Sequence, residues 1–507
     1  MSTNVQPVVE PIDLETLDLD SFTGQPVAVL GLARSGVALA RFLADRGAMV
    51  TVYDASPADA LGAGIESLGS RPVRLLLGPD VDPAGALDGQ ALITTSPSIN
   101  SRYPTTEPRL RAALAAVEAE GRVPVVSEVD LFLRLCPALT VGVTGTKGKT
   151  TTSSLAAAVL SAGTQAALLG GNIGTPLVER LPELTAHHRV VLELSELQLP
   201  TLSRGTDVAV YTHVTSDHID RHGSLEAYRA VKQRLAELLP LTGCLVINAE
   251  DPVAAGYDGL TRAPVVRYRR SAPASGEVGV DDEWIVGDGV ERLAMIGGGP
   301  AMTGPGGRIL PLGEVMLPGA HNTSNVLAAV ATGLVLGIAP DAIRRAVAAF
   351  SGVEHRLEAV ALVGDVAFVN DSQGTQPDAV VAALRSFAPP IVLIAGGRSK
   401  GVDLTELASE VARRAAAVVL IGESAEEMAG LFGGAGVSRI ERAASIDDAV
   451  RQAWAVAREL LPAPNTAGRT ATVVLSPAAA SFDMFTDYAE RGRAFKDAVH
   501  ALARSTD

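Results

Sequence analysis

The 507-residue chain has few cysteines, few aromatic residues and a deficit of positive charge. Its two cysteines, Cys136 and Cys244, cannot form a disulfide framework, and neither lies in the Cys-x-x-Cys pattern of many zinc sites. Aromatic residues make up only 4% of the chain, so the core must consist mostly of Ala, Val and Leu. Lys and Arg number 42 against 57 Asp and Glu, and the net charge of −15 argues against a protein that coats nucleic acid.

Long hydrophobic runs are also missing. The longest apolar stretch, 326–339, is too short to span a bilayer and is interrupted by Thr332, Gly333 and Gly337. The first twenty residues are acidic and lack the basic and apolar segments of an export signal. We therefore expect a soluble, cytoplasmic protein that does not insert into membranes.

The length predicts about three domains at roughly 150 residues per domain. Strand-like and helix-like segments alternate in three blocks, which indicates an α/β fold with parallel sheets. A stretch rich in Gly, Pro and Ser, 271–310, is typical of a surface hairpin or loop. The predicted strands lie at 27–30, 49–53, 91–95, 139–143, 190–194, 208–211, 244–247, 366–369, 391–394, 417–421 and 472–475.

A first glycine turn, Gly31-Leu-Ala-Arg-Ser-Gly36, follows a predicted strand and opens a helix, which is the context of a dinucleotide fingerprint. Ala33 replaces the middle glycine, whose lack of a side chain lets the backbone touch a pyrophosphate. This replacement weakens an NAD site. Two interpretations stay open: a nucleotide or sugar diphosphate bound in another pose, and a purely structural turn.

A second glycine turn, Val143-Thr-Gly-Thr-Lys-Gly-Lys-Thr-Thr151, carries a stronger signal. The backbone N–H groups of such a loop converge on phosphate oxygens, Lys149 can reach the terminal phosphates, and the Thr150 hydroxyl can join Mg²⁺. The loop is a short form of the standard one, because Val143 stands where the first glycine is expected. The alternative is a lysine-bearing turn without a ligand.

Acidic and imidazole side chains follow downstream. Glu193 ends a predicted strand, where a carboxylate can serve as a hard oxygen ligand. Asp217, His218 and Asp220 fall within four positions, and a metal-binding turn or a solvated acidic loop would explain them equally well. Lys232 lies on a predicted helix over 225–239, where a lysine is usually solvated.

Taken in order, these motifs resemble the Mur ligase family of ATP-dependent amide-bond-forming enzymes, and the resemblance extends over nearly the whole chain. It implies a Rossmann-like N-terminal domain over 1–123 that binds the UDP-muramoyl substrate. It further implies a central P-loop ATPase domain with a parallel sheet over 124–352, and a Rossmann-like C-terminal domain over 353–507 for glutamate and ATP. The matching motifs are the Gly145 loop, 170–174, Glu193, Asp217-His218, 228–232, 318–325, 352–358, 369–372, 395–400 and 475–483.

The resemblance implies a reaction and its substrates. A monomeric ligase of peptidoglycan precursor synthesis would add D-glutamate to UDP-N-acetylmuramoyl-L-alanine through an acyl phosphate, releasing ADP and phosphate. Family members that add L-glutamate or another amino acid remain alternatives. The implied ATP-binding residues are Gly145, Thr146, Lys147, Gly148, Lys149, Thr150, Thr151, Asn322, Asn325, Arg356 and Asp371.

The remaining site residues are also implied by the resemblance. Lys149, Glu193, His218 and Lys232 would be catalytic. Two Mg²⁺ ions would be held by Thr150, Glu193, His218 and Lys232, with the lysine carbamylated so that it offers oxygen instead of an ammonium. The substrate-binding residues would be Arg34, Ser35, Asp54, Ala55 and Ser56 for the uridine diphosphate, Asn172, Ser195, Gln198 and His218 for the muramoyl group, and Thr375, Lys400, Ser481, Phe482 and Tyr488 for glutamate.

Three positions depart from the family pattern: Lys147 replaces an asparagine, Ser98 a glycine and Gln373 a lysine. Two other protein classes compete with a ligase. A dinucleotide-dependent oxidoreductase would use the Gly31 turn and leave the Lys149 loop unexplained. A P-loop switch protein would use the Lys149 loop and leave the C-terminal motifs unexplained.

Overall fold

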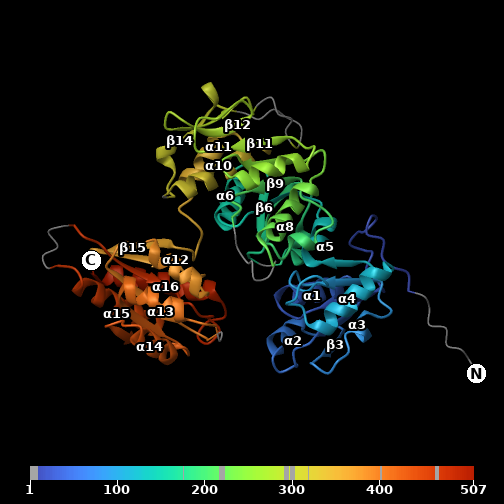
Figure 1. Ribbon diagram of the computed structural model, residues 1–507, viewed down its shortest axis with the longest axis horizontal. Coiled ribbons are helices and arrows are strands. Elements are labelled where there is room, and N and C mark those ends of the chain that lie inside the picture. The colour runs from blue at the N-terminus through green and yellow to red at the C-terminus, as the bar shows by residue number, and fades with distance from the viewer. Residues whose placement is uncertain are drawn as a thin grey trace, which may run out of the picture. The chain divides into compact units, whose positions relative to one another are not determined.

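The computed structural model describes residues 9–174, 176–215, 223–290, 296, 303–317, 319–399, 402–462 and 468–506. The chain divides into two compact units, Met1–Phe350 and Ser351–Asp507, and strands alternate with helices in both (Figure 1). The described residues form three sheets, two in the first unit and one in the second.

The first sheet has five parallel strands in the order β3-β2-β1-β4-β5. The chain changes direction beside the central strand β1, as it does in Rossmann-like folds. The strands are β1 (Pro26–Leu30), β2 (Met49–Asp54), β3 (Val73–Leu77), β4 (Leu92–Thr95) and β5 (Val125–Ser127). The helices are α1 (Arg34–Asp45), α2 (Gly62–Leu68), α3 (Ala84–Leu87), α4 (Pro108–Glu120) and α5 (Glu128–Leu135).

The second sheet has nine strands in the order β14-β13-β12-β11-β10-β9-β6-β8-β7. Strands β7 to β12 pair in parallel, whereas β12, β13 and β14 pair antiparallel at one edge. The bounds are β6 (Leu139–Thr144), β7 (Ala166–Gly171), β8 (His188–Glu193), β9 (Val208–Tyr211), β10 (Cys244–Asn248), β11 (Val265–Tyr268), β12 (Glu277–Asp281), β13 (Trp284–Asp288) and β14 (Arg308–Pro311).

The hairpin predicted over 271–310 is present, because β12 and β13 pair antiparallel around a two-residue turn, but it belongs to the main sheet and is not a separate surface loop. The described part of this stretch contributes β12, β13 and most of β14 to the main sheet. Val278, Ile285 and Leu310 are buried there, because they pack against the same core as the parallel strands. The glycines and prolines of this stretch lie mainly in its turns. Its few apolar residues belong to the hydrophobic core and stabilise the strands in the sheet.

Helices and short 3-10 turns cover both faces of the second sheet. One face packs against α6 (Lys149–Ser161), α10 (Ala320–Val335) and α11 (Pro340–Ala349). The apolar stretch noted above becomes α10, which is buried from 325 to 335, and no helix in the described ranges is long and apolar enough to cross a membrane. The remaining elements are α8 (Leu225–Glu237), α9 (Pro252–Ala255), η1 (Leu177–Glu183), η2 (Leu199–Thr201), η3 (Gly256–Leu260), η5 (Pro305–Gly307) and η6 (Leu312–Glu314).

A single apolar cluster joins the two sheets of the first unit. It runs from Val27 and Val29 in β1 to Leu192 in β8 and Tyr211 in β9. An ion pair of 3.2 Å between Arg41 on α1 and Glu179 on η1 adds to this contact. The boundary predicted between residues 123 and 124 therefore lies inside one compact unit, and the predicted domain limits stay predictions.

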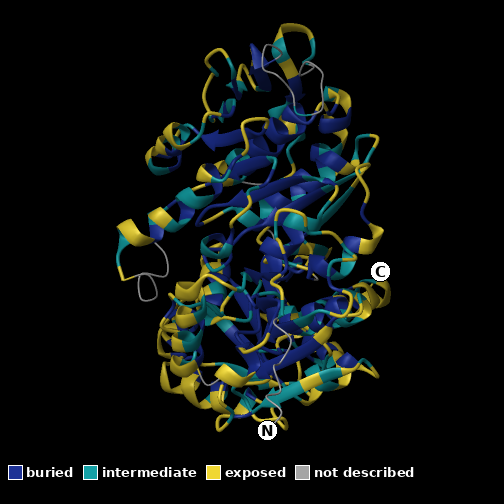
Figure 2. Cartoon of the chain, turned by 90° about the vertical axis from the view of Figure 1, so that its right-hand side faces the viewer, coloured by how far each residue is buried: buried dark blue, intermediate teal, exposed yellow. Residues whose placement is uncertain are grey.

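The second unit has a six-stranded sheet in the order β15-β16-β20-β17-β18-β19, in which only the β15–β16 pair is antiparallel among the described strands. Two apolar clusters occupy its two faces. Over the described chain as a whole, buried segments lie inside a more exposed periphery (Figure 2). The elements are β15 (Glu358–Val363), β16 (Val366–Asn370), β17 (Ile391–Gly396), β18 (Ala415–Ile421), β19 (Ile440–Arg442), β20 (Ala471–Leu475), α12 (Pro377–Arg385), α13 (Thr405–Arg414), α14 (Ala425–Gly434), α15 (Ile446–Glu459) and α16 (Tyr488–Thr506). The predicted α/β fold with parallel sheets is confirmed.

Candidate active site

The second glycine turn joins β6 to α6, and two of its glycines have no room for a side chain. Gly145 has a φ of +148°, and a Cβ there would lie 2.0 Å from Thr212 Oγ1. Gly148 has a φ of +88°, and a Cβ there would lie 2.3 Å from Asn325 Oδ1. The loop therefore packs tightly between the end of β9 and the start of α10.

Hydrogen bonds hold this loop against the end of β9. The Thr146 N–H donates to the His213 carbonyl over 2.6 Å, and Thr212 Oγ1 donates to the Lys147 carbonyl over 2.7 Å. Lys149 Nζ donates to the carbonyl oxygens of Gly145 and Thr146, at 3.1 and 3.0 Å. The ammonium is thus placed at the loop, beside the N-terminus of α6, where anions are stabilised.

A pocket of about 500 Å³ opens beside the loop. Four strand ends and the first turns of α10 contribute to its walls, and basic side chains outnumber acidic ones there. Of the predicted ATP-binding residues, Lys147, Gly148 and Asn325 lie in its lining, and Asn322 accepts a hydrogen bond from Asn325 over 3.1 Å. The lining residues are Lys147, Gly148, Thr212, His213, Asn248, Glu250, Tyr268, Arg270, His321, Ser324 and Asn325.

Glu193 lies at the end of β8, directly beside β6, because Val143 and Glu193 are paired in the parallel sheet. Its side chain is buried, and Asn172 Nδ2 donates to Oε1 over 2.9 Å. Within the described residues, the other oxygen, Oε2, is buried without a hydrogen-bond partner. A buried carboxylate oxygen without a partner is unfavourable, so this position fits a bound cation.

Lys232 is fully buried on α8, and the interpretation of a solvated helix lysine is wrong. Its Nζ donates to Thr144 Oγ1 over 3.3 Å and lies 5.5 Å from the centre of the Tyr228 ring. Thr144 is the last residue of β6, so Lys232 approaches the glycine loop from the opposite side of the sheet edge from α10. The composition of α8 gave no signal for this burial, because the helix is polar on average, whereas the family resemblance predicts Lys232 at the site.

The described residues offer oxygen donors for one of the two predicted metal ions. Thr150 is buried in the first turn of α6, and Glu193 offers one carboxylate oxygen; both are oxygen donors of the kind that Mg²⁺ prefers. His218, Asp217 and Asp220 lie outside the described residues. Among the residues that are described, no three His, Cys, Asp or Glu side chains converge on a point that could hold a metal. The residues present fit one Mg²⁺ at Glu193.

Three of the predicted muramoyl-binding residues lie close to Glu193: Asn172 follows β7, and Ser195 and Gln198 follow β8. Ser195 donates to Gln198 Oε1 through its N–H at 2.9 Å and its hydroxyl at 3.0 Å, and both side chains are buried. The Asn172 N–H donates to the Glu193 carbonyl over 2.8 Å. The three residues therefore lie at the same edge of the sheet as the glycine loop.

The first glycine turn is held differently. Asp54 accepts from the Leu32 N–H through one oxygen and from the Ser56 N–H through the other, each over 2.8 Å. A Cβ on Gly36 would lie 1.8 Å from the Gly31 carbonyl oxygen, so α1 can begin only if this residue is glycine. Arg34 is exposed, and three further predicted uridine-side residues are partly buried: Ser35, Ala55 and Ser56.

In the second unit, Arg356 and Asp371 line one pocket of about 240 Å³ together with Gln373 and Gly374. Burial raises the pKa of Asp371 to about 6, although a 2.6 Å hydrogen bond from Ser476 Oγ opposes that shift. A Cβ on Gly374 would lie 2.4 Å from Asp371 Oδ2. This glycine therefore permits the close Asp371–Ser476 contact, which a larger residue would break.

The predicted glutamate-binding residues of the second unit are only partly enclosed. Ser481 is buried and Thr375 and Tyr488 are half-buried, whereas Phe482 is 65% exposed, and their assignment to glutamate stays a prediction. Lys400 lies outside the described residues.

Sequence reasoning missed Arg491, a buried residue on α16. Its Nε and Nη2 donate to the hydroxyl and carbonyl of Ser372, both over 3.0 Å, and Nη1 donates to the carbonyls of Ala479 and Ala480. Burial lowers the pKa of this guanidinium to about 10. A single arginine on an amphipathic helix carries no signal that it is buried.

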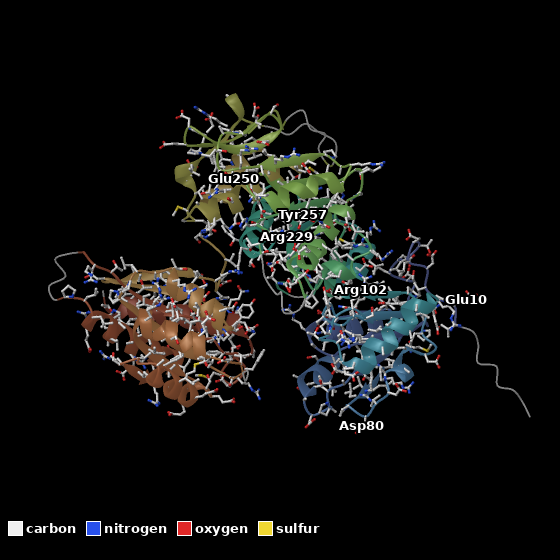
Figure 3. The ribbon with its side chains drawn as sticks, in the orientation of Figure 1. Glu10, Asp80, Arg102, Arg229, Glu250 and Tyr257 are labelled. Atoms are coloured by element: carbon white, nitrogen blue, oxygen red, sulfur yellow. The ribbon has the colours of Figure 1, made fainter. Side chains whose placement is uncertain are left out.

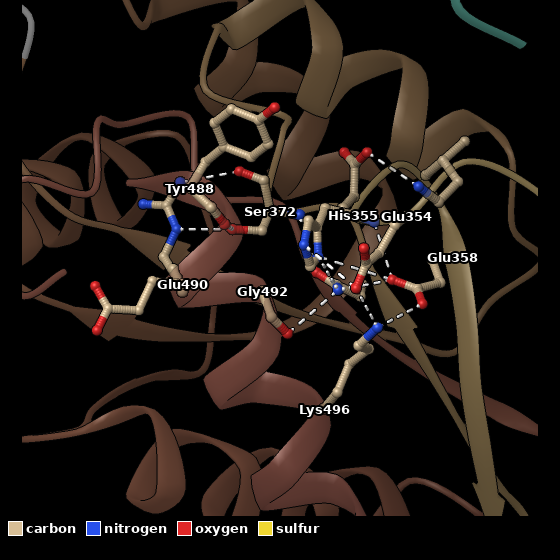
Figure 4. A network of polar contacts seen from close by, with 12 residues as sticks. Glu354, His355, Glu358, Ser372, Tyr488, Glu490, Gly492 and Lys496 are labelled. Atoms are coloured by element: carbon tan, nitrogen blue, oxygen red, sulfur yellow. Dashed lines mark hydrogen bonds and ion pairs between the residues drawn. The ribbon is translucent and has the colours of Figure 1, made fainter. Parts of the chain in front are cut away.

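A second polar network adjoins these contacts (Figure 4). Asn370 Nδ2 lies 2.9 Å from His355 Nδ1 and donates to Glu358 over 3.0 Å. Lys496 Nζ donates to Glu354 over 2.7 Å and to Glu358 over 3.0 Å. The network fixes the segment before β15 against β16 and α16, next to Arg356.

The fold and the site define an α/β protein with a lysine-bearing glycine loop at a helix N-terminus and a buried carboxylate at the neighbouring strand end. The Mur ligase middle domain matches residues 143–333, and the Mur ligase, glutamate ligase domain matches residues 355–462. The chain belongs to the Mur ligase family, and it is an ATP-dependent ligase that forms amide bonds.

Two curated relatives match almost end to end. A UDP-N-acetylmuramoylalanine--D-glutamate ligase of Symbiobacterium thermophilum is 38% identical over 94% of this chain and 98% of its own. A ligase of the same name from Pelotomaculum thermopropionicum is 36% identical over 96% of this chain and 100% of its own. Among solved structures, a UDP-N-acetylmuramate-alanine ligase of Thermotoga maritima has a TM-score of 0.50 at 15% identity, over 94% of this chain and 100% of its own, which shows the shared fold alone.

Proposed function

We propose that this ligase joins D-glutamate to UDP-N-acetylmuramoyl-L-alanine and converts ATP to ADP and phosphate. The observation that supports this proposal most is the end-to-end match with two ligases named for this activity, at 38% and 36% identity. The glycine loop with Lys149, next to the buried Glu193, supplies the chemistry that such a reaction needs.

The reaction has two steps. An oxygen of the alanyl carboxylate attacks the γ-phosphorus of ATP, ADP leaves, and an acyl phosphate forms. The neutral amine of glutamate then attacks the acyl carbon, phosphate leaves with the bridging oxygen, and the amine loses a proton. Phosphorylation is required because oxide is a poor leaving group from a carboxylate, whereas phosphate is a good one.

The residues of the chain act mainly by offsetting the negative charge of the phosphates and by positioning the groups that bind them. The loop N–H groups and Lys149 offset the charge of the phosphates as the phosphoryl group moves. Asn172 holds one oxygen of Glu193 and leaves the other for the site. Mg²⁺ at Glu193 and Thr150 would neutralise the transferred phosphoryl group when bound. A carbamylated Lys232 would supply oxygen at its buried position.

The substrates are assigned to the elements on which their predicted ligands lie. The uridine diphosphate is assigned to the first sheet, at Arg34, Ser35 and the turn after β2. The muramoyl group is assigned to Asn172, Ser195 and Gln198, and the adenine to the pocket at Asn325. Glutamate is assigned to the hydroxyls of the second unit, which can donate hydrogen bonds to carboxylates: Thr375 and Ser481.

A competition between glutamate enantiomers tests the proposal. The enzyme receives ATP, UDP-N-acetylmuramoyl-L-alanine and equal amounts of ¹³C-labelled D-glutamate and unlabelled L-glutamate. We expect phosphate release and a product that carries almost only the heavy label. Omitting the muramoyl substrate is the control, and it should abolish phosphate release.

An L-glutamate-adding enzyme is the second candidate. Gln373 favours it, because a neutral side chain stands where family members have a lysine, and within the described residues its Oε1 is buried without a partner. A product without the heavy label would replace D-glutamate by L-glutamate in the proposal. No phosphate release with either enantiomer would contradict the proposed function itself.

A further inference from the structure

The nucleotide pocket extends along the carboxyl edge of four adjacent strands. The sheet order places β6, β9, β10 and β11 side by side, and the glycine loop follows β6. Neighbouring strands lie ~4.8 Å apart, so the end of β11 is roughly 14 Å from the loop. Residues after each of these strands line the pocket: Gly148, His213, Glu250 and Arg270. With phosphates at the loop, the base of a nucleotide reaches the β10–β11 end.

An ion pair stands at that far end. Arg270 Nε lies 2.7 Å from Glu250 Oε2, and the two residues follow β11 and β10 by two positions each. Asn248 Oδ1 accepts from the Glu250 N–H over 3.0 Å and so fixes the turn that carries the carboxylate. Glu250 is labelled in Figure 3.

A second pocket, of about 320 Å³, lies on the other side of this ion pair. Glu250 and Arg270 belong to the lining of both pockets, so the pair is their common boundary. The second pocket has an apolar part formed by Val280, Leu312 and Ala320. Nothing in the reaction proposed above uses this space.

We propose that the Glu250–Arg270 ion pair is a specificity wall that closes the base end of the nucleotide site. This inference rests on the proposed ATP site. Ribose is attached at N9 of a purine, so the edge that carries N6 is the far edge and faces the end of the pocket. The wall admits adenine and excludes purines with a bulky N6 substituent, whereas its removal joins the two pockets and makes room for such a group.

The test compares the dissociation constants of ADP and N6-benzyl-ADP, measured by calorimetry on the full chain with Mg²⁺. In Arg270→Ala, we expect the dissociation constant of N6-benzyl-ADP, divided by that of ADP, to fall at least about tenfold. A steric misfit of one group in a pocket typically weakens binding by about tenfold or more. Glu250→Ala removes the ion-pair partner of Arg270 but keeps the arginine side chain, so it should lower the same ratio by a smaller factor.

Arg267→Ala is the matched control. Arg267 lies on β11, forms an ion pair with Asp258 and lines neither pocket, so the ratio should stay as in the unchanged chain. Thermal melting reports whether each variant is folded. An unchanged ratio in folded Arg270→Ala and Glu250→Ala that still bind ADP would overturn the wall. Failure of the unchanged chain to bind ADP would instead contradict the proposed ATP site.

Discussion

The two glycine turns of the first unit occupy the same local context and differ in how their carboxylates are used. Each turn follows a buried strand and opens a helix, at Gly31–Gly36 and at Gly145–Gly148. Beside the first turn, both oxygens of Asp54 accept backbone N–H groups. Beside the second, one oxygen of Glu193 has no hydrogen-bond partner within the described residues.

The difference separates a carboxylate that holds the backbone from one with capacity left for a ligand. Asp54 stabilises its turn, because each of its carboxylate oxygens accepts a backbone N–H. Glu193 is buried at a cost in free energy that a bound cation would offset. Substitutions of the charged side chains at the second turn, Lys149 and Glu193, should therefore lower activity and spare stability. Substitutions of Gly36 or Asp54 at the first turn should mainly lower stability.

The largest effect on activity is expected at Lys232, which is buried against the last residue of β6. Lys232→Ala should lower turnover by about 10³-fold, at the upper end for one positioned group. Short carboxylic acids should partly restore activity if a carbamylated lysine supplies the missing oxygens. Phosphate release with and without added acid measures both effects, and full activity without dependence on dissolved CO₂ would contradict carbamylation.

Lys149→Ala should lower turnover on the order of 10²–10³-fold, because it removes the cation that offsets phosphate charge at the loop. The thermal midpoint should stay close to that of the unchanged chain, since Lys149 Nζ donates to carbonyl oxygens of its own loop. Steady-state kinetics and a melting curve check this pair of outcomes. Near-normal ligation by a folded variant would refute the role of Lys149.

Glu193→Gln should lower turnover on the order of 10²-fold and raise the Mg²⁺ concentration needed for half-maximal rate. The amide keeps an acceptor for Asn172 and removes a buried charge, so the free energy of unfolding should stay the same or rise. Titration of Mg²⁺ and denaturant unfolding measure the two quantities. A loss of stability together with an unchanged Mg²⁺ requirement would make Glu193 a structural carboxylate like Asp54.

Gly36→Ala should lower the free energy of unfolding by about 1–3 kcal/mol, because the new Cβ would overlap the Gly31 carbonyl oxygen. Gly85→Ala on α3 is the control: a Cβ there meets no atom within 4 Å, so stability should hold or rise slightly. Denaturant unfolding of both variants measures the difference. Equal stabilities would show that the first turn tolerates a side chain.

Asp54→Ala should cost about 1–2 kcal/mol of unfolding free energy, because two backbone N–H groups lose their acceptors. ADP binding should change little, since the glycine loop lies on another sheet. Asp80→Ala, at an exposed carboxylate of the same sheet's periphery, is the control and should be nearly neutral. If the Asp54→Ala variant is as stable as the unchanged chain but fails to bind the uridine nucleotide, Asp54 binds the nucleotide and does not stabilise the turn.

The predicted strands were mainly the interior ones. Six of the strands that the sequence analysis did not predict are at sheet edges: β3, β5, β7, β14, β15 and β19. An interior strand is buried on both faces and is apolar throughout, as Ile391–Gly396 is. An edge strand such as Glu358–Val363 is only partly buried, and its mixed composition gives no clear period.

The α/β alternation, the two glycine turns and the ordered motifs that indicate a Mur ligase could be predicted from the sequence, because these depend on local backbone requirements and on residue identity. Which polar groups have partners became visible only in the folded chain. The tertiary structure brought Lys232 to Thr144 across 88 positions, left one oxygen of Glu193 unpaired among the described residues, and placed the Glu250–Arg270 pair between two pockets. Burial and pairing arise from contacts between distant segments, and no local pattern of residues encodes them.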